Sequence, residues 1–221
     1  MAKKKIMVIG LGILGETVAR TLAEDGAEVI ALDKDPIYVE RVKDTTAMAI
    51  EGDSTDPKLL DQLGVTKLDS VIVCIGENFP GALMTTVMLL DIGVKHVAVR
   101  ATSEMHYKLL KKIGAHEVFF VESEMGMAIA HRLQSPEIIN EMNLGAGFRI
   151  IESPVCDWMV GKTIQDIALP TNYGVQIVAM RDSEKPTELI MPRAQTPLES
   201  KYNMLYVGKD RDLDKLIKSK G

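Results

Sequence analysis

Three glycines and an aspartate are the residues whose types and spacing first suggest chemistry. Gly10, Gly12 and Gly15 follow a short apolar run, and Asp33 closes the next one. In a βαβ unit the first glycine makes the turn, the second lets backbone approach a pyrophosphate, and the third allows close helix packing. A helix beginning near Leu14 would aim its free N–H groups at the phosphates. Asp33 can accept both ribose hydroxyls and would repel a 2′-phosphate, so the pattern predicts an adenine nucleotide other than NADP.

Two later loops would extend this site. Asp53 and Ser54 follow the third predicted strand in "EGDST", and Gly76 follows the fourth in "CIGEN". Ligands of open α/β sheets bind at the carboxyl ends of the strands, where these loops would meet. Structural alternatives stay open: the glycines could serve packing alone, and the Asp53 loop could merely start a helix. Cys74 is interpreted as a small buried residue and not as a nucleophile.

The chain lacks a recognisable set of residues for catalysis. The four histidines are typical of surfaces or interfaces: one opens a predicted strand, two fall in amphipathic helices and one lies in a loop, namely His96, His106, His131 and His116. No Ser/His/Asp spacing, phosphate-loop GxxxxGK or H-E-x-x-H motif occurs. An NAD-dependent oxidoreductase with a small second domain therefore remains an alternative that rests on the glycine pattern alone.

Alternating strands and helices would position these residues. Short apolar runs predict strands at 6–9, 28–32, 47–50, 71–75, 96–100 and 117–121. Periodic segments between them end at glycines, and Asp35-Pro36 and Asp56-Pro57 mark two helix starts. The predicted fold class is α/β: a Rossmann-like doubly wound parallel sheet followed by a small α+β C-terminal domain.

The pattern changes after residue 122. A helix is expected at 123–134 and a second short helix at 136–144, whose apolar edge of Ile138, Ile139 and Met142 could contact a partner subunit. Further strands are expected at 148–152, 175–180, 188–191 and 204–207, with helices near 162–168 and 210–218. We predict a nucleotide-binding domain at 1–122, linker helices at 123–143 and a C-terminal domain at 144–221, which is small enough to favour self-association.

Composition excludes several classes of function. The 221 residues carry a net charge of −5, which does not favour a nucleic-acid partner. No signal peptide and no run of about 18 apolar residues is evident, so we expect a cytoplasmic protein. Two distant cysteines, Cys74 and Cys156, suit a reducing compartment and argue against a zinc site.

Four blocks of the chain resemble the KTN/RCK family, of the KtrA/TrkA type. They are "VIGLGILGETVARTLAEDGAEVIALDKD", "EGDSTDPKLLDQLGVTKLDSVIVCIGEN", "KLLKKIGAHEVFFVESEMGMAIA" and "VGKTIQDIALPTNYGVQIVAMRD". The resemblance implies a non-enzymatic regulatory subunit of a potassium transporter or channel. It implies dimers assembled into a ring, expected to be octameric, beneath a membrane subunit of the KtrB/TrkH type. ATP, ADP or NAD(H) would occupy the crevice and gate the pore.

The resemblance also implies a set of site residues. The nucleotide would contact Gly10, Gly12, Ile13, Leu14, Gly15, Asp33, Lys34, Asp53, Ser54, Gly76, Glu77, Asn78 and Arg100. Glu122 matches a glutamate associated with a divalent cation at the dimer interface, although an acid there could equally cap the helix that follows.

Two positions depart from the family pattern. Ile13 stands where close relatives carry an arginine that meets terminal phosphates, so a strong preference for a triphosphate is not expected. Pro170 stands where some relatives place an arginine of a cyclic dinucleotide site, and that ligand is not carried over. A nucleotide-binding scaffold or sensor unconnected to potassium is a third hypothesis.

Overall fold

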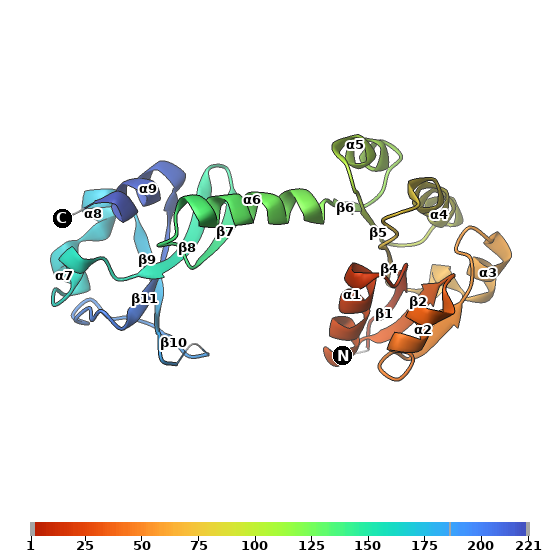
Figure 1. Ribbon diagram of the computed structural model, residues 1–221, viewed down its shortest axis with the longest axis horizontal. Helices are drawn as coiled ribbons and strands as arrows, with labels where there is room; N and C mark the ends of the chain where they lie inside the picture. The colour runs from red at the N-terminus through yellow and green to blue at the C-terminus, as the bar shows by residue number, and fades with distance from the viewer. Residues whose placement is uncertain (1–2, 186, 220–221) are drawn as a thin grey trace. The chain divides into compact units, whose positions relative to one another are not determined.

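The computed structural model divides the chain into two compact units, residues 1–124 and 125–221. It describes residues 3–185 and 187–219. Figure 1 labels the helices and strands in chain order, and each unit is described by itself below.

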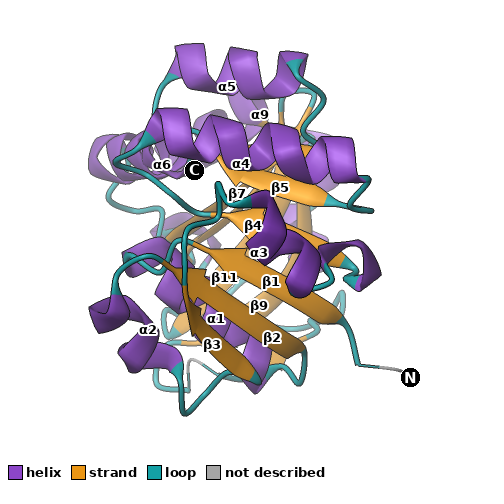
Figure 2. Ribbon diagram, turned by 90° about the vertical axis from the view of Figure 1, so that its right-hand side faces the viewer, coloured by secondary structure: helices purple, strands orange, loops and turns teal. Residues whose placement is uncertain are grey.

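A parallel six-stranded sheet forms the centre of the first unit. Its order is β3-β2-β1-β4-β5-β6, and every pair is parallel. The strands are β1 (Lys5–Ile9), β2 (Glu28–Asp33), β3 (Met48–Glu51), β4 (Ser70–Val73), β5 (Val97–Arg100) and β6 (Glu117–Phe119). The strand order reverses between β1 and β4, so the predicted doubly wound sheet is confirmed, and the crevice for a ligand falls at that switch point. Figure 2 shows β3, β2, β1, β4 and β5 side by side in this order.

Alternate residues along β1 belong to different apolar layers. Met7 and Ile9 join a core that includes residues of α3, α4 and α5, whereas Val8 joins one that includes residues of α1 and α2. Successive strand side chains point to opposite faces, so helices cover both faces and the strands read as continuous apolar runs. The helices are α1 (Ile13–Glu24), α2 (Pro36–Val42), α3 (Pro57–Gln62), α4 (Phe79–Ile92) and α5 (Glu104–Lys112), with a 3-10 turn η1 (Val65–Lys67).

The two predicted helix starts are confirmed. The Asp35 carboxylate accepts a hydrogen bond from the Ile37 N–H at 2.9 Å, and Asp56 accepts one from Lys58 N–H at 2.9 Å. Proline occupies the first helical position in both cases, where its missing N–H costs no helical hydrogen bond. These caps fix where α2 and α3 leave the carboxyl edge of the sheet.

The predicted short helix at 136–144 is wrong. The expected helix at 123–134 is present as α6 (Val121–Gln134), but residues after it form strand β7 (Asn140–Gly145), paired with β8 (Phe148–Pro154). Gly145, Ala146 and Gly147 all have positive φ and make the hairpin turn. Ile138 is buried in the core of the second unit, so it cannot form the exposed helix edge that its spacing predicted.

An antiparallel five-stranded sheet forms the second unit. Its order is β10-β9-β11-β8-β7, with β9 (Gln176–Asp182), β10 (Leu189–Ile190) and β11 (Tyr202–Lys209). The remaining elements are η2 (Asp157–Met159), α7 (Ile164–Ile167), α8 (Leu169–Tyr173) and α9 (Asp210–Lys218). The predicted α+β architecture is confirmed, and the sequence missed β7 and α8. None of the helices in the described part of the chain has the length and apolar character that a membrane span requires.

Candidate nucleotide-binding site

A cavity of about 870 Å³ opens at the carboxyl edge of the parallel sheet. The predicted residues that line it are Gly10, Gly12, Ile13, Leu14, Asp33, Lys34, Asp53, Ser54, Gly76, Glu77, Asn78 and Arg100. Gly15 lies outside the lining. Residues distant in sequence therefore meet at the one edge where β1, β2, β3, β4 and β5 end.

The three glycines of the first loop have different structural roles. Gly10 has φ +85°, and a Cβ on it would lie 2.9 Å from the Ile75 backbone nitrogen. A Cβ on Gly15 would lie only 1.8 Å from the Gly10 carbonyl oxygen, so Gly15 allows α1 to approach the loop. Gly12 precedes α1 with open space around its Cα, and α1 has no side-chain cap. The free N–H groups of this helix are therefore available to an anion.

Asp33 holds the glycine loop in place. Its carboxylate accepts hydrogen bonds from the Leu11 N–H at 2.6 Å and from the Asp35 N–H at 2.9 Å. A carboxylate offers about four acceptor positions, so two remain for the hydroxyls of a ribose. Asp33 thus combines loop positioning, which the sequence did not predict, with the expected capacity for ribose recognition.

The loop after β3 contributes one anchored carboxylate and one buried hydroxyl. The Thr55 hydroxyl and N–H donate to Asp53 at 2.7 and 2.8 Å and, with Lys34 nearby, hold the pKa of Asp53 below its ordinary value. The Ser54 hydroxyl is buried and lies 2.8 Å from the Thr85 hydroxyl on α4. Asp53 therefore presents a charged acceptor to the cavity, whereas the Ser54 hydroxyl also ties this loop to α4.

The loop after β4 brings backbone and an amide to the cavity. Asn78 begins α4, and its side chain accepts a hydrogen bond from the Gly81 N–H at 3.1 Å. Glu77 is exposed beside it. Burial raises the pKa of the Cys74 thiol to about 12, so the thiol is protonated at neutral pH and the interpretation of Cys74 as a buried small residue is confirmed.

Arg100 is one of two basic side chains that line the cavity, the other being Lys34. Its guanidinium lies over Gly76, where a Cβ would come within 2.6 Å of Nη1. It donates a hydrogen bond to the Glu122 carboxylate on α6, which lowers the pKa of Glu122. The Arg100 Nε–H is shielded from solvent and has no hydrogen-bond partner in the described part of the chain. An additional acceptor, such as a phosphate oxygen, would satisfy this group.

Glu122 does not form a metal site within one chain. Across residues 3–185 and 187–219, no group of three or more His, Cys, Asp or Glu side chains could hold an ion. The carboxylate of Glu122 is also engaged by Arg100. Cation binding would need ligands from outside this chain.

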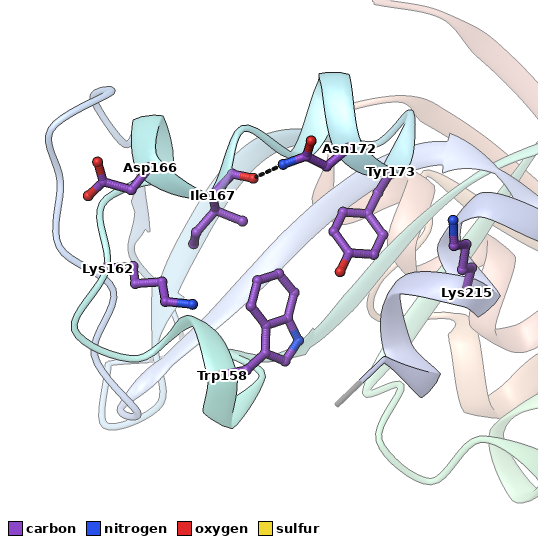
Figure 3. A pocket seen from close by; sticks show the side chains of 7 residues that line it. All are labelled: Trp158, Lys162, Asp166, Ile167, Asn172, Tyr173 and Lys215. Atoms are coloured by element: carbon purple, nitrogen blue, oxygen red, sulfur yellow. Dashed lines mark hydrogen bonds between the residues drawn. The ribbon is translucent and has the colours of Figure 1, made fainter. Parts of the chain in front are cut away.

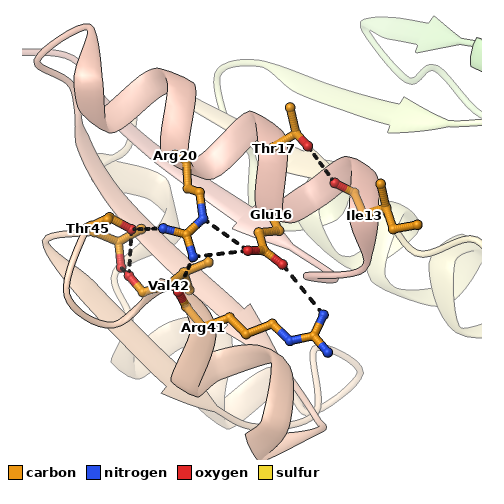
Figure 4. A network of polar contacts seen from close by, with 8 residues as sticks. Ile13, Glu16, Thr17, Arg20, Arg41, Val42 and Thr45 are labelled. Atoms are coloured by element: carbon orange, nitrogen blue, oxygen red, sulfur yellow. Dashed lines mark hydrogen bonds and ion pairs between the residues drawn. The ribbon is translucent and has the colours of Figure 1, made fainter.

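Ile13 is the exposed apolar residue at the mouth of the cavity, with 90% of its surface accessible. Figure 4 shows it at the start of α1, where the Thr17 hydroxyl donates to its carbonyl oxygen at 2.8 Å. One turn further on, Glu16 pairs with Arg20 at 3.0 Å and with Arg41 at 3.7 Å. The Glu16–Arg20 pair lies within α1, whereas the Glu16–Arg41 pair joins α1 to α2, the two helices beside the glycine loop.

Several lining residues were not predicted from the sequence. They are Ile9, Thr17, Leu32, Tyr38, Gly52, Thr55, Cys74, Ile75, Gly81, Thr102 and Val121. Tyr38 has the largest side chain among these residues, and the guanidinium of Arg41 lies over its ring, 5.0 Å from the centroid. Its position two residues after a Pro-marked helix start was the one available signal, because residue type alone does not distinguish a lining tyrosine from a surface tyrosine.

The doubly wound sheet, the glycine loop and the carboxylate at the end of β2 define the class: a Rossmann-type nucleotide-binding domain joined to a second α+β domain. The chain belongs to the family with a TrkA-N domain followed by a TrkA-C domain, whose family models match residues 6–121 and 149–221.

Known relatives match nearly the whole length of the chain. It is 32% identical to the Ktr system potassium uptake protein C of Bacillus subtilis strain 168, over 98% of this chain and 97% of the relative. It is 29% identical to the Ktr system potassium uptake protein A of Vibrio alginolyticus, over 98% and 97%.

Solved structures share the fold. The GsuK channel is similar with a TM-score of 0.72 at 18% identity, over 100% of this chain and 40% of that one. The GsuK channel bound to NAD gives a TM-score of 0.67 at 18% identity, over 99% and 40%. This chain spans less than half of the channel chain, so these structures establish the fold alone.

Proposed function

We propose that this protein is a nucleotide-binding regulatory subunit that gates a membrane potassium transporter or channel and is not an enzyme. The observation that carries the proposal is the cavity itself, because an α1 N-terminus without a side-chain cap, the Asp33 carboxylate and the Arg100 guanidinium converge on it. The relatives named as potassium uptake proteins support the membrane partner. The NAD-bound channel of the same fold supports an adenine nucleotide as ligand.

In this proposal each part of the nucleotide has its own partners. Free N–H groups at the start of α1 bind the pyrophosphate, and Asp33 accepts the ribose hydroxyls. Asp53 and the loop at Ser54 lie on the adenine side. The guanidinium of Arg100 faces the phosphates together with the Gly76 loop.

The assembly is part of the same proposal. Residues 1–122 form the nucleotide domain and 144–221 the regulatory domain; of the predicted linker, 123–143, the last residues already belong to β7 in the sheet of the second unit. Dimers form a ring, expected to be octameric, on the cytoplasmic side of a membrane subunit of the KtrB/TrkH type. A divalent cation at Glu122 needs further ligands from a second copy or the nucleotide, since the Glu122 carboxylate is paired with Arg100 and residues 3–185 and 187–219 hold no group of three or more metal-ligating side chains.

Gating requires a ligand that binds two states of the ring with different affinity. The decisive experiment reconstitutes the full chain with its membrane subunit and measures potassium flux with ATP, ADP and NADH. We expect flux to change with at least one nucleotide, without its consumption. Nucleotide binding that leaves flux unchanged would contradict gating, and a substrate-dependent change in nicotinamide absorbance would favour an oxidoreductase.

Ile13 offers a test of nucleotide placement. Ile13→Arg adds a guanidinium at the cavity mouth, which we expect to favour ATP over ADP by about tenfold in calorimetric titrations, the size of one charge-assisted hydrogen bond. The matched control is Ile37→Arg, an equally apolar exposed position on α2 that does not line the cavity. Equal ATP and ADP affinities in Ile13→Arg would show that terminal phosphates lie elsewhere.

A further inference from the structure

A second cavity lies within the C-terminal unit. It has a volume of about 380 Å³, and its lining residues are Trp158, Lys162, Asp166, Ile167, Asn172, Tyr173 and Lys215. Figure 3 shows these side chains, which come from η2, from the loop before α7, from α7 itself, from α8 and from α9. No part of the nucleotide site contributes to it.

Two aromatic rings form one wall of this cavity. The rings of Trp158 and Tyr173 lie with centroids 5.7 Å apart at an interplanar angle of 31°. In Figure 3 the Tyr173 hydroxyl points toward the Trp158 indole. Such a pair offers a flat apolar surface on which another ring can stack or contact edge-on.

Two ammonium groups flank the rings. Lys162 Nζ lies 5.2 Å from the centroid of the Trp158 ring, and Lys215 Nζ lies 5.8 Å from that of Tyr173. Neither lysine has a carboxylate partner among the ion pairs of the described residues, whereas Arg149, Arg181, Lys201 and Arg211 of the same unit do. Two unneutralised cations facing one cavity favour an anion there.

The remaining polar groups of the cavity also favour an anion that brings hydrogen-bond acceptors. The Trp158 indole Nε1–H is shielded from solvent and finds no acceptor within residues 3–185 and 187–219. A shielded donor without an acceptor costs free energy that a bound oxygen would recover. The one acid, Asp166, accepts from the Thr163 hydroxyl at 2.7 Å and points away from the rings in Figure 3, so it does not neutralise the lysines.

We propose that this cavity binds a small organic anion: a single flat ring that carries one carboxylate or phosphate group. The ring contacts Trp158 and Tyr173. The acidic oxygens accept hydrogen bonds from the Trp158 indole and the ammonium groups of Lys162 and Lys215. Cavities for drug-sized ligands occupy roughly 300–1,000 Å³, so a volume near the lower limit suits one ring better than a larger ligand.

Trp158 is the single tryptophan of the chain, which gives the test a direct signal. The full-length protein is titrated with phenyl phosphate, benzoate, inorganic phosphate and phenol, while indole fluorescence and the one indole ¹H–¹⁵N resonance are recorded. We expect saturable changes with phenyl phosphate or benzoate at millimolar concentrations or below, the stronger of the two identifying the acidic group. Inorganic phosphate and phenol should bind at least about tenfold more weakly, since each lacks half of the recognised chemistry.

Variants assign the contacts. Lys162→Ala and Lys215→Ala should each weaken binding about tenfold, and Trp158→Phe, followed by calorimetry, should do likewise because it keeps a ring but removes the donor. Lys218→Ala is the matched control, since Lys218 lies near the end of the same helix as Lys215 and does not line the cavity. Absence of saturable binding, or an equal loss in Lys218→Ala, would overturn the proposal.

Discussion

The two cavities of this protein are built from different parts of the chain. The nucleotide cavity depends on backbone geometry: glycines, strand ends and the start of α1 contribute to it, and Asp33 secures the glycine loop. The cavity of the C-terminal unit is made by side chains, namely two rings and two lysines on short elements. A backbone-built site depends on particular φ values and close approaches, so its glycines mark it in the sequence. A site built from side chains has no comparable sequence signal, because its residue types also occur at positions outside any site.

Among the changes that separate the two cavities, Gly15→Ala should produce the largest loss of stability. The new Cβ would meet the Gly10 carbonyl oxygen at 1.8 Å, so α1 must move away from the loop. We expect the free energy of unfolding to fall by about 3 kcal/mol in urea titrations, the upper part of the usual range for overpacking. The C-terminal cavity should keep its probe affinity in the folded fraction.

Gly12→Ala is the matched control for that change. Gly12 has φ −60° and no atom within 4 Å of its built Cβ, so stability should change by less than about 0.5 kcal/mol. Nucleotide affinity should nevertheless drop, because the methyl group enters the space for the pyrophosphate. Unchanged nucleotide affinity would contradict the placement of phosphates at this helix terminus.

Asp33→Ala should have an intermediate effect that reaches both stability and binding. Two backbone N–H groups lose their acceptor, at a cost of roughly 1–3 kcal/mol. Affinities for ATP, ADP and NADH, measured by calorimetry, should fall by similar factors, because all three share the ribose. Asp35→Ala removes only the cap of α2, about 1 kcal/mol, and should leave nucleotide affinity intact. A loss confined to one nucleotide would place the ribose away from Asp33.

The smallest predicted effect is the pH dependence of stability that one carboxylate contributes in each unit. A threonine hydroxyl and its backbone N–H hold the pKa of Asp53 and of Asp166 below the ordinary value. Because the folded pKa is the lower one, each carboxylate stabilises the fold above its ordinary pKa, and this contribution disappears as pH falls through the folded pKa.

Threonine-to-valine changes separate the two carboxylates. In NMR titrations Thr55→Val should raise the pKa of Asp53 and leave Asp166 unchanged, and Thr163→Val should do the reverse. The readout is the carboxyl ¹³C shift against pH. A pKa of Asp53 that does not move in Thr55→Val would show that this hydroxyl bond is absent in solution.

The prediction of one element failed for a physical reason. Ile138, Ile139 and Met142 have helical spacing, but the chain from Asn140 pairs with β8 through a turn at 145–147. Local periodicity cannot report a hydrogen-bonding partner that lies further along the chain, so tertiary pairing decided the outcome.

The sequence by itself determined the doubly wound parallel sheet and nearly all of the predicted residues that line the cavity at its carboxyl edge, because apolar runs, capping aspartates and glycines specify local backbone geometry. Only the tertiary structure decided that Asp33 secures the glycine loop, that Arg100 pairs with Glu122 and that Trp158, Tyr173 and two lysines share a cavity. Those contacts join residues far apart in sequence. They depend on how separate elements pack, and no local pattern of residue types encodes that.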